Sequence, residues 1–230
     1  LQNKKFILAA DIGSNPDKIY TKDYQAGALS FEIFSNDKKL ISNSGYYPDT
    51  KNRLNKLSKS TALQNTLSIE DYSSSDFIKS SNNFLIQKDL KIENKNIVFE
   101  KNYWKISASH NGYFKKFKLD HHREIEFYPE QFKFIGHDKI VRKDPDKQIK
   151  FDIRFHLHPD SKVMKTQNSK FILIQLEDEG WQFSCDNYDI NIDNGLYFGN
   201  KNSYQENQNI FISGMNNESE QIIRWEIIKI

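Results

Sequence analysis

Residues 151–160, FDIRFHLHPD, alternate apolar and polar side chains up to Pro159. Successive side chains of a β-strand point to opposite faces. Four apolar side chains can therefore face a core, while Arg154, His156 and His158 form a row on the other face. Pro159 lacks a backbone N–H and is expected to end the strand. The stretch predicts a strand with one buried face and one cationic face.

Short runs of the same kind recur along the chain, separated by polar turns. Their spacing favours an antiparallel sandwich or barrel over alternating strands and helices. We find no amphipathic helix of normal length, although residues 52–57 could make about one turn. Asn111 and Gly112 predict a tight hairpin, because both tolerate a positive φ. The Ser-, Asn- and Lys-rich residues 71–96 predict a long loop with one irregular strand at most.

The composition limits the classes of protein to which the chain can belong. The chain has 230 residues, 37% of them hydrophobic and 13% aromatic, which can fill the core of a single domain spanning residues 1–230. The net charge of +2, from 33 basic and 31 acidic residues, argues against a dedicated nucleic-acid or membrane protein but permits local basic patches. Cys185 is the only cysteine, which excludes an intramolecular disulfide and a cysteine metal cluster.

Targeting signals are absent from the sequence. No apolar run approaches ~20 residues, so no membrane-spanning helix is predicted. The first residues, LQNKKFILAADIGS, lack the long apolar region and the cleavage site of a signal peptide, and they lack an initiating Met. We therefore expect the chain to be a fragment of a longer protein, and its own sequence leaves the compartment open.

Three blocks of sequence are distinctive when taken together. The first contains GALSFEIFSNDKKLISNSG within residues 9–45, followed by STALQNTLSIED at 60–71. The second is ISASHNGYFKKFKLDHHREI at 106–125, and the third is IRFHLHPD at 153–160, followed by LEDEGWQFSCDN and LYFGNKN. In order and spacing, these blocks resemble the C-terminal part of the heparinase II/III-like family over essentially the whole chain.

The resemblance implies a two-layer β-sandwich of antiparallel strands, with little or no helix, that follows an N-terminal (α/α) toroid in the family. The family's enzymes are lyases that cleave uronate-containing polysaccharides, such as glycosaminoglycans, by β-elimination, mostly in the bacterial periplasm. The cleft lies between toroid and sandwich. The implied partners are thus an acidic polysaccharide and the toroid, the implied location is the periplasm or cell envelope, and the isolated sandwich is expected to be inactive.

The sequence departs from the family pattern at its metal and catalytic positions. Where family lyases carry His-x-His-x-Asp, this chain has Asp23, Gln25 and Gly27. A metal-binding Asp is replaced by Asn43, and a further His by Gln64. Zinc in proteins favours imidazole, thiolate and carboxylate ligands, whereas neutral amides can instead bond one another, the backbone or a sugar hydroxyl. We predict that the chain binds no structural zinc and carries no cofactor.

Other candidate site residues leave a functional and a structural role open. His110 and Tyr113 would flank the predicted hairpin tip, where they could act as base or acid in a lyase or belong to a solvated turn. Arg123 could bind a uronate carboxylate, because the guanidinium fork matches that shape, or could pair with Glu124 or Glu126.

The row of Arg154, His156 and His158 has three interpretations. A metal site would need a third ligand that the neighbouring sequence does not supply. A cationic row could meet an anionic glycan or a neighbouring domain, or it could be an ordinary polar face. Substrate binding by this row, together with Arg123 and Gln25, is the functional hypothesis.

Asp23 could serve as a weak base or be a simple loop acid. Four aromatic residues could stack on sugar rings, although the two tryptophans lie in strand runs and are more typical of a core. These are Tyr46, Tyr47, Trp104 and Trp181. Two functional hypotheses follow: one wall of the cleft of a polysaccharide lyase, or a non-catalytic sandwich that binds a glycan or packs on the toroid.

Overall fold

The computed structural model describes residues 1–17, 20–21, 23–80, 83–86, 90–167, 170–199 and 203–230. Most of them belong to β-strands. The strands are β1 (Phe6–Ala10), β2 (Phe31–Ser35), β3 (Lys38–Ile41), β4 (Leu67–Ile69), β5 (Phe77–Ser80), β6 (Asn83–Ile86), β7 (Ile92–Phe99), β8 (Trp104–His110), β9 (Leu119–Tyr128), β10 (Lys133–Arg142), β11 (Ile149–His156), β12 (Lys162–Lys165), β13 (Phe171–Leu176), β14 (Glu179–Cys185), β15 (Ile190–Tyr197), β16 (Gln205–Asn216) and β17 (Glu220–Lys229). The helices are α1 (Arg53–Ser58) and α2 (Phe114–Phe117), and the 3₁₀ turns are η2 (Thr61–Leu63) and η3 (Pro129–Gln131).

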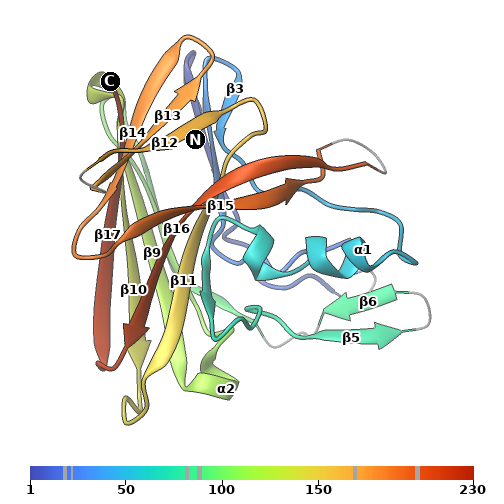
Figure 1. Cartoon of the computed structure of the whole chain (residues 1–230). Coiled ribbons are helices and arrows are strands. Elements are labelled where there is room, and N and C mark those ends of the chain that lie inside the picture. The colour runs from blue at the N-terminus through green and yellow to red at the C-terminus, as the bar shows by residue number, and fades with distance from the viewer. Residues whose placement is uncertain (18–19, 22, 81–82, 87–89, 168–169, 200–202) are drawn as a thin grey trace.

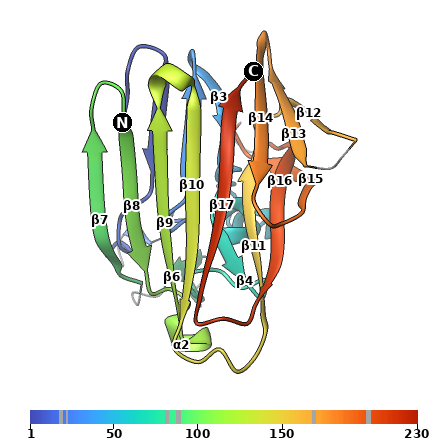
Figure 2. The same cartoon turned by 90° about the vertical axis from the view of Figure 1, so that its left-hand side faces the viewer.

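Two layers of antiparallel strands form the body of the molecule (Figures 1 and 2). One layer is an eight-stranded sheet in the order β12-β13-β14-β17-β10-β9-β8-β7. The other contains a four-stranded sheet, β15-β16-β11-β4, and a three-stranded sheet, β1-β2-β3. One cluster of buried hydrophobic side chains joins all three sheets. The expected all-β, two-layer antiparallel sandwich is confirmed.

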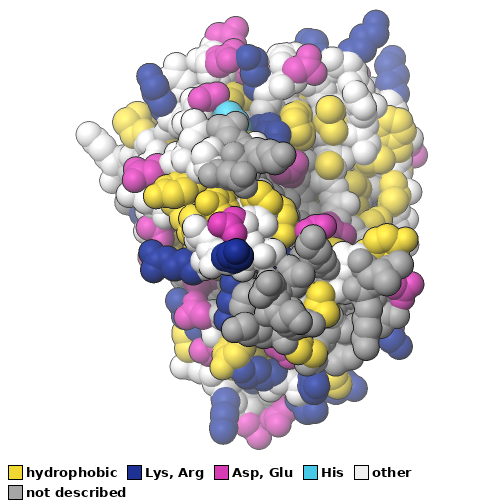
Figure 3. Space-filling model, turned by 90° about the vertical axis from the view of Figure 1, so that its right-hand side faces the viewer, with side chains coloured by type: hydrophobic (Ala, Val, Ile, Leu, Met, Phe, Trp, Pro, Cys, Tyr) yellow, Lys and Arg dark blue, Asp and Glu magenta, His cyan; other side chains and the backbone are white. Residues whose placement is uncertain are grey.

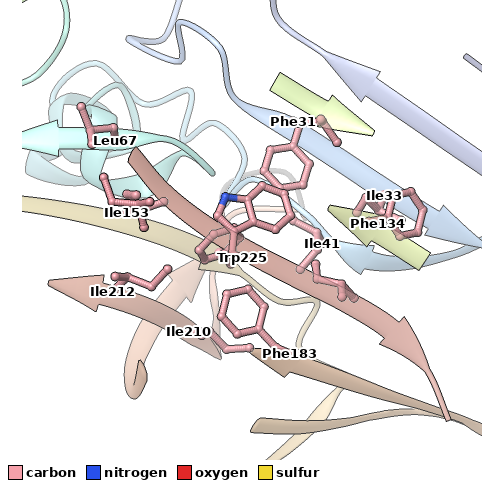
Figure 4. Close-up of a cluster of buried hydrophobic side chains, with 14 of the residues drawn as sticks. Phe31, Ile33, Ile41, Leu67, Phe134, Ile153, Phe183, Ile210, Ile212 and Trp225 are labelled. Atoms are coloured by element: carbon pink, nitrogen blue, oxygen red, sulfur yellow. The ribbon is translucent and has the colours of Figure 1, made fainter. Parts of the chain in front are cut away.

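Trp225 of β17 lies at the centre of this core (Figure 4). Its buried indole stacks on Phe31 of β2 with ring centroids 5.3 Å apart, and it meets Phe155 of β11 edge-on at 4.9 Å. Gly136 lies opposite Trp225 on β10, and a Cβ atom there would overlap the indole ring. Trp225 thus ties the two layers together, and Gly136 is needed because of this close approach.

The buried apolar face predicted for residues 151–157 is confirmed in β11. The apolar side chains of residues 151–157 are all fully buried. The opposite face is not a continuous cationic row, however, because His156 is 1% exposed and lies beneath η2, where it contacts the carbonyl of Ala62. Only Arg154 and His158 of the row are partly exposed. The sequence left open what this face meets, and at His156 it meets a 3₁₀ turn that is distant in sequence.

The single helical turn predicted at residues 52–57 is α1, whose first turn is capped by the Asn52 side chain accepting from Leu54 N–H. The antiparallel pairing predicted for the strands on either side of Asn111 and Gly112 is confirmed, because β8 pairs with β9, but the tight two-residue turn between them is wrong. Neither residue has a positive φ, and α2 separates β8 from β9. Gly112 is needed instead for close packing, because a Cβ atom there would collide with the carbonyl oxygen of Ser74.

The predicted long loop at residues 71–96 contains more strand than expected, because β5 and β6 form an antiparallel pair and β7 begins at Ile92. Residues 81–82 and 87–89 of that prediction lie outside the described residues. Within the described part of the chain, no helix is long and apolar enough to cross a membrane.

Candidate functional site

Gln25, Asn43 and Gln64 form one neighbourhood, here called the carboxamide cluster. The Gln25 side-chain amide donates to the carbonyls of Gly45 at 2.7 Å and Ser58 at 2.6 Å. Gln64 donates to the same Ser58 carbonyl at 3.4 Å. Gln25 and Gln64 thus share one acceptor, the carbonyl of Ser58.

Asn43 completes the cluster from the segment that follows β3. Its amide nitrogen donates to Ser30 Oγ at 3.4 Å, and its Oδ1 accepts from the Asn65 backbone N–H at 2.7 Å. A Cβ atom at Gly27 would lie 3.0 Å from Ser30 Oγ and 3.3 Å from Gln64 Oε1, so Ser30 and Gln64 flank the same glycine. Asn43 thus adjoins Gln64 across Ser30.

The carboxamide cluster does not fit zinc. Its N–H groups already donate to carbonyl and hydroxyl oxygens, and neutral amides are not among the ligands that zinc favours. In the described residues, no group of three or more His, Cys, Asp or Glu side chains is arranged to hold a metal. The absence of a structural zinc stays a prediction.

A buried ionic network lies beside the carboxamide cluster. Arg123 of β9 binds Asp138 of β10 through two parallel hydrogen bonds, Nε to Oδ1 at 2.7 Å and Nη2 to Oδ2 at 3.0 Å. Arg123 Nη1 donates to the carbonyls of Leu29 at 2.9 Å and Asn65 at 2.5 Å. The Trp225 indole N–H also donates to Asp138, at 2.9 Å. Arg123 therefore bridges the two layers of the sandwich.

This network decides between the two roles open for Arg123. The guanidinium is 3% exposed and has a carboxylate partner inside the protein, which supports the structural role. The expected pairing of Arg123 with Glu124 or Glu126 is wrong. Side chains alternate along β9, so both glutamates lie on its outer face, where Glu124 pairs with Lys105. Binding of a uronate by Arg123 stays a prediction, and it would require displacement of Asp138.

Two histidines extend the network toward α2. His110 Nδ1 accepts from the Gly112 N–H at 3.0 Å, so its proton lies on Nε2, which donates to His121 Nδ1 at 3.2 Å. His121 Nε2 then donates to Asp138 at 2.7 Å. Burial lowers the pKa of both imidazoles, which are therefore neutral. Burial alone would raise the pKa of Asp138, but Arg123 and His121 hold it below the ordinary value.

His110 and Tyr113, the predicted catalytic pair, do lie together, with ring centroids 5.5 Å apart. They are only 2% and 1% exposed, and the Tyr113 hydroxyl donates to the carbonyl of Leu67 at 2.8 Å. Burial raises the pKa of the Tyr113 phenol, so it stays protonated. Their proposed acid–base roles stay predictions.

The row of Arg154, His156 and His158 has one buried member and two partly exposed members. His156 accepts from Ser44 at Nδ1 and donates to the carbonyl of Ala62 from Nε2, at 3.2 and 3.0 Å, and burial lowers its pKa to about 4. Arg154 lies 3.6 Å from Asp152, which is also buried. His158 is partly exposed and lies 3.3 Å from Asp160. Arg154 and His158 are the members of the row that a ligand could reach.

A model of the family described as heparinase II/III-like, C-terminal matches residues 1–226 of the chain. The chain belongs to this family. FtsZ-localized protein C of Caulobacter vibrioides is 25% identical over 237 residues, which cover 96% of this heparinase II/III-like chain and 40% of that relative.

Solved structures show the same fold. Heparan sulfate lyase HepC from Pedobacter heparinus superposes with a TM-score of 0.71 at 14% identity, over 89% of this chain and 30% of the lyase. Heparinase III superposes with a TM-score of 0.72 at 14% identity, over 98% of this chain and 33% of that enzyme. The heparinase II/III-like chain therefore spans about a third of the length of these two enzymes.

Asp23, which the sequence left open as a weak base or a loop acid, belongs to a second polar cluster. Asp23 is exposed and accepts from the Tyr46 hydroxyl at 3.2 Å, while Tyr46 accepts from Asn55 Nδ2 at 3.0 Å. Lys59 is fully buried, with its ammonium 5.7 Å from the centre of the Tyr46 ring. We call Asp23, Tyr46, Asn55 and Lys59 the tyrosine cluster.

Sequence reasoning identified Asp23 and Tyr46 separately and missed Asn55 and Lys59. A lysine that follows a short helix is usually solvated, so nothing in the sequence marks Lys59 as internal. Trp104 and Trp181, by contrast, are 1% and 0% exposed, which confirms them as core residues.

Proposed function

We propose that this heparinase II/III-like domain forms one wall of a cleft that binds an acidic, uronate-containing polysaccharide in a longer, lyase-type protein. The family match over residues 1–226 carries the proposal. The other wall would be an N-terminal (α/α) toroid, and the protein would work in the periplasm or cell envelope.

The polymer-facing surface of this wall contains the tyrosine cluster. β-Elimination needs a group that removes the C5 proton, neutralisation of the uronate carboxylate, and a proton for the leaving oxygen. Burial raises the pKa of Tyr46, so its phenol is protonated at neutral pH and suits the donor role. The Asp23 carboxylate accepts a hydrogen bond from the Tyr46 hydroxyl. Gln25 Oε1 has no hydrogen-bond partner among the described residues and can accept from a sugar hydroxyl.

The face that carries α1 and β5 supports packing against a further domain. Leu57 of α1 is 41% exposed, and Ile78 of β5 is 51% exposed. Figure 3 shows this face, where hydrophobic side chains lie among charged ones rather than in a purely charged surface. A mixed surface of this kind is typical of contacts between domains of one chain. We assign the toroid contact to this face.

A second candidate function is a non-catalytic module that binds glycan or packs on the toroid. One observation favours it: the imidazoles of His110, His121 and His156 are buried, and each already has hydrogen-bond partners inside the protein. On that hypothesis the tyrosine cluster binds polymer without cleaving it.

One experiment separates the two candidates. The full-length protein is incubated with heparan sulfate, alginate and other uronate polymers, and the absorbance of unsaturated uronate products is followed. A lyase gives product, and the Asp23→Asn, Tyr46→Phe variant abolishes it while leaving the fold unchanged by circular dichroism. Binding without product on the whole panel supports the non-catalytic module. Neither product nor binding would overturn the cleft-wall proposal and the glycan-binding form of the second candidate, and it would favour a module that only packs on the toroid.

A further inference from the structure

The eight-stranded sheet ends at two edge strands, β7 and β12, which Figure 2 shows on opposite sides of the molecule. An edge strand directs half of its backbone N–H and C=O groups away from the sheet, so short length and lysines usually protect it from other chains. β12 has only four residues, with a lysine at each end. β7 has eight residues and carries Ile97 and Phe99, which are 54% and 55% exposed. β7 is therefore the less protected edge.

Ile97 and Phe99 lie on the face of β7 that points into the sandwich. The register with β8 places Ile97 opposite Ile106 and Phe99 opposite Trp104, and directly opposed residues share a face of the sheet. Ile106 and Trp104 are buried core residues, yet more than half of each β7 side chain is exposed. We call Ile97 and Phe99 the β7 strip, an apolar surface that faces inward without being covered.

The backbone groups of the same two residues point away from β8. The Glu100 N–H donates to the Tyr103 carbonyl at 2.9 Å across the β7–β8 turn, so these two residues form a hydrogen-bonded pair. Such pairs alternate with non-hydrogen-bonded pairs along an antiparallel ladder. Val98 is therefore bonded to β8, whereas Ile97 and Phe99 direct their N–H and C=O groups to the open edge. Among the described strands, none pairs with β7 on that side.

The beginning of β7 is covered. The Ile92 N–H donates to Ser14 Oγ at 3.1 Å, and an irregularity between Glu93 and Asn96 interrupts the regular ladder with β8. The regular stretch that remains open is residues 96–99. Its side chains and backbone groups thus offer a short, straight template for one more strand.

We propose that this edge pairs with β7 of a second copy of the chain, antiparallel and about a two-fold axis at Val98. In this register, Ile97 of one copy lies opposite Phe99 of the other. Both residues direct their N–H and C=O groups to the edge, so each such pair can exchange two hydrogen bonds. The β7 strips of the two copies then form one apolar cluster on the inner face, and the large sheet continues from one copy into the other.

The edge is also complementary to itself in its polar residues. With the axis at Val98, Asn96 of one copy lies opposite Glu100 of the other, where the amide can donate to the carboxylate. One end of the segment carries Glu93 and Lys95, and the other carries Glu100 and Lys101. Antiparallel pairing brings these ends together with one acid and one base on each, so the charges do not oppose association. A two-fold axis uses the same surface twice, which makes a second copy the occupant that fits.

Pairing of so few residues makes a small interface, and small interfaces are typical of weak, concentration-dependent association. The β7 edge is separate from the tyrosine cluster and from the face of α1 and β5. The proposed dimer therefore holds whether the protein cleaves a polymer, binds it or only packs on another domain.

The test measures the full-length protein by sedimentation velocity over concentrations from micromolar to submillimolar. We expect a reversible monomer–dimer equilibrium. Ile97→Lys and Phe99→Glu should each raise the dissociation constant of the dimer at least about tenfold, because each places a charge against an apolar partner. Both positions are more than half exposed, so the fold should be unchanged by circular dichroism. Met164→Lys is the matched control, because Met164 is 62% exposed on the other edge strand, β12, and should leave the dimer intact.

Mixing variants tests the register. In a dimer of Ile97→Lys with Phe99→Glu, the two introduced charges of opposite sign face each other, and the remaining Phe99 and Ile97 form the second pair. This mixture should recover the dimer. A mixture of Ile97→Lys with Ile97→Glu should not, because residue 97 does not face itself in the proposed register.

Three results would overturn the proposal. The first is a full-length protein that stays monomeric at every concentration, as expected if another part of the same chain covers β7. The second is a dimer that Ile97→Lys and Phe99→Glu leave intact, or that Met164→Lys weakens equally. The third is recovery in the mixture of the two Ile97 variants but not in the mixture of Ile97→Lys with Phe99→Glu, which would exclude the axis at Val98. Lyase activity is not part of this readout, so the result is independent of the proposed cleft.

Discussion

Two polar regions lie side by side inside this sandwich, and they differ in charge. The network of Arg123 and Asp138 is ionised and closed by two parallel hydrogen bonds, whereas the carboxamide cluster is neutral and bonds mainly to backbone carbonyls. Asn65 joins them, because its carbonyl accepts from Arg123 and its N–H donates to Asn43. The difference shows that the interior keeps one compensated charge pair and uses neutral carboxamides in the neighbouring region.

The largest effect is expected from breaking the ionic region. Asp138→Asn leaves the Arg123 guanidinium buried without a counter-charge, which should lower the free energy of unfolding by ~3–5 kcal/mol. Urea denaturation followed by tryptophan fluorescence measures the loss. Glu124→Gln is the matched control, because Glu124 lies next to Arg123 on β9 and its loss breaks only a partly exposed ion pair with Lys105 of the neighbouring β8, which should cost less than ~1 kcal/mol. Equal losses in the two variants would contradict the comparison.

Acid should destabilise the neutral imidazole beside the carboxamide cluster. Burial lowers the pKa of His156 from the ordinary value of 6.5 to about 4. Between these two pH values, the unfolded chain therefore binds a proton at this residue that the folded chain does not bind. Stability is complete above about pH 6.5 and falls as the pH drops toward 4, by up to ~3 kcal/mol from this residue.

The measurement compares the pH dependence of urea unfolding for the natural protein and His156→Gln. The variant should lose this part of the slope between about pH 6.5 and 4 and keep the part that comes from His110 and His121. Identical slopes would show that His156 does not titrate differently in the folded and unfolded states.

A smaller loss is expected from the neutral region. Gln25→Leu leaves the carbonyls of Gly45 and Ser58 without this donor, at a cost of ~1–3 kcal/mol. Gln131→Leu, at an exposed position, should change stability by no more than about 0.5 kcal/mol. If Gln25→Leu lowered the free energy of unfolding as much as Asp138→Asn, the carboxamide cluster would contribute as much stability as the ionic network, which would contradict the comparison.

The smallest effect concerns metal. Purified protein should contain no stoichiometric zinc by inductively coupled plasma mass spectrometry, and a chelator should leave its melting temperature unchanged, since amides hold the positions concerned. Stoichiometric zinc, or a melting temperature that falls with chelator, would refute the neutral description of the cluster.

Alternation along strands predicted much of this interior and contained a signal that sequence reasoning did not use. On β10, Asp138 shares a face with Phe134 and Ile140, and on β9, Arg123 shares a face with Ile125. An acid and a base on two apolar faces indicate a buried pair, since isolated charges are costly in a core. The partners themselves could not be assigned, because they depend on the register of β9 against β10, which pairs Arg123 with Asp138.

The candidate site was less predictable than the fold. The family resemblance singled out Gln25, Asn43 and Gln64 as a set, because its pattern relates distant segments that local sequence cannot relate. The burial of Tyr113 and His156 could not be read from local sequence, since each contacts residues far along the chain. Exposure of a polar side chain depends on what another element places above it, and alternation alone gives only the face.

The position of Arg123 between the layers also bears on how the chain folds. Its bonds to Leu29 and Asn65 join groups 94 and 58 residues apart, and contacts of such separation form late because they must first overcome loop-closure entropy. We therefore expect closure of the two sheets around this guanidinium to be among the last and slowest steps. A chain arrested before it would present two apolar sheet faces to its neighbours, the condition under which aggregation competes with folding.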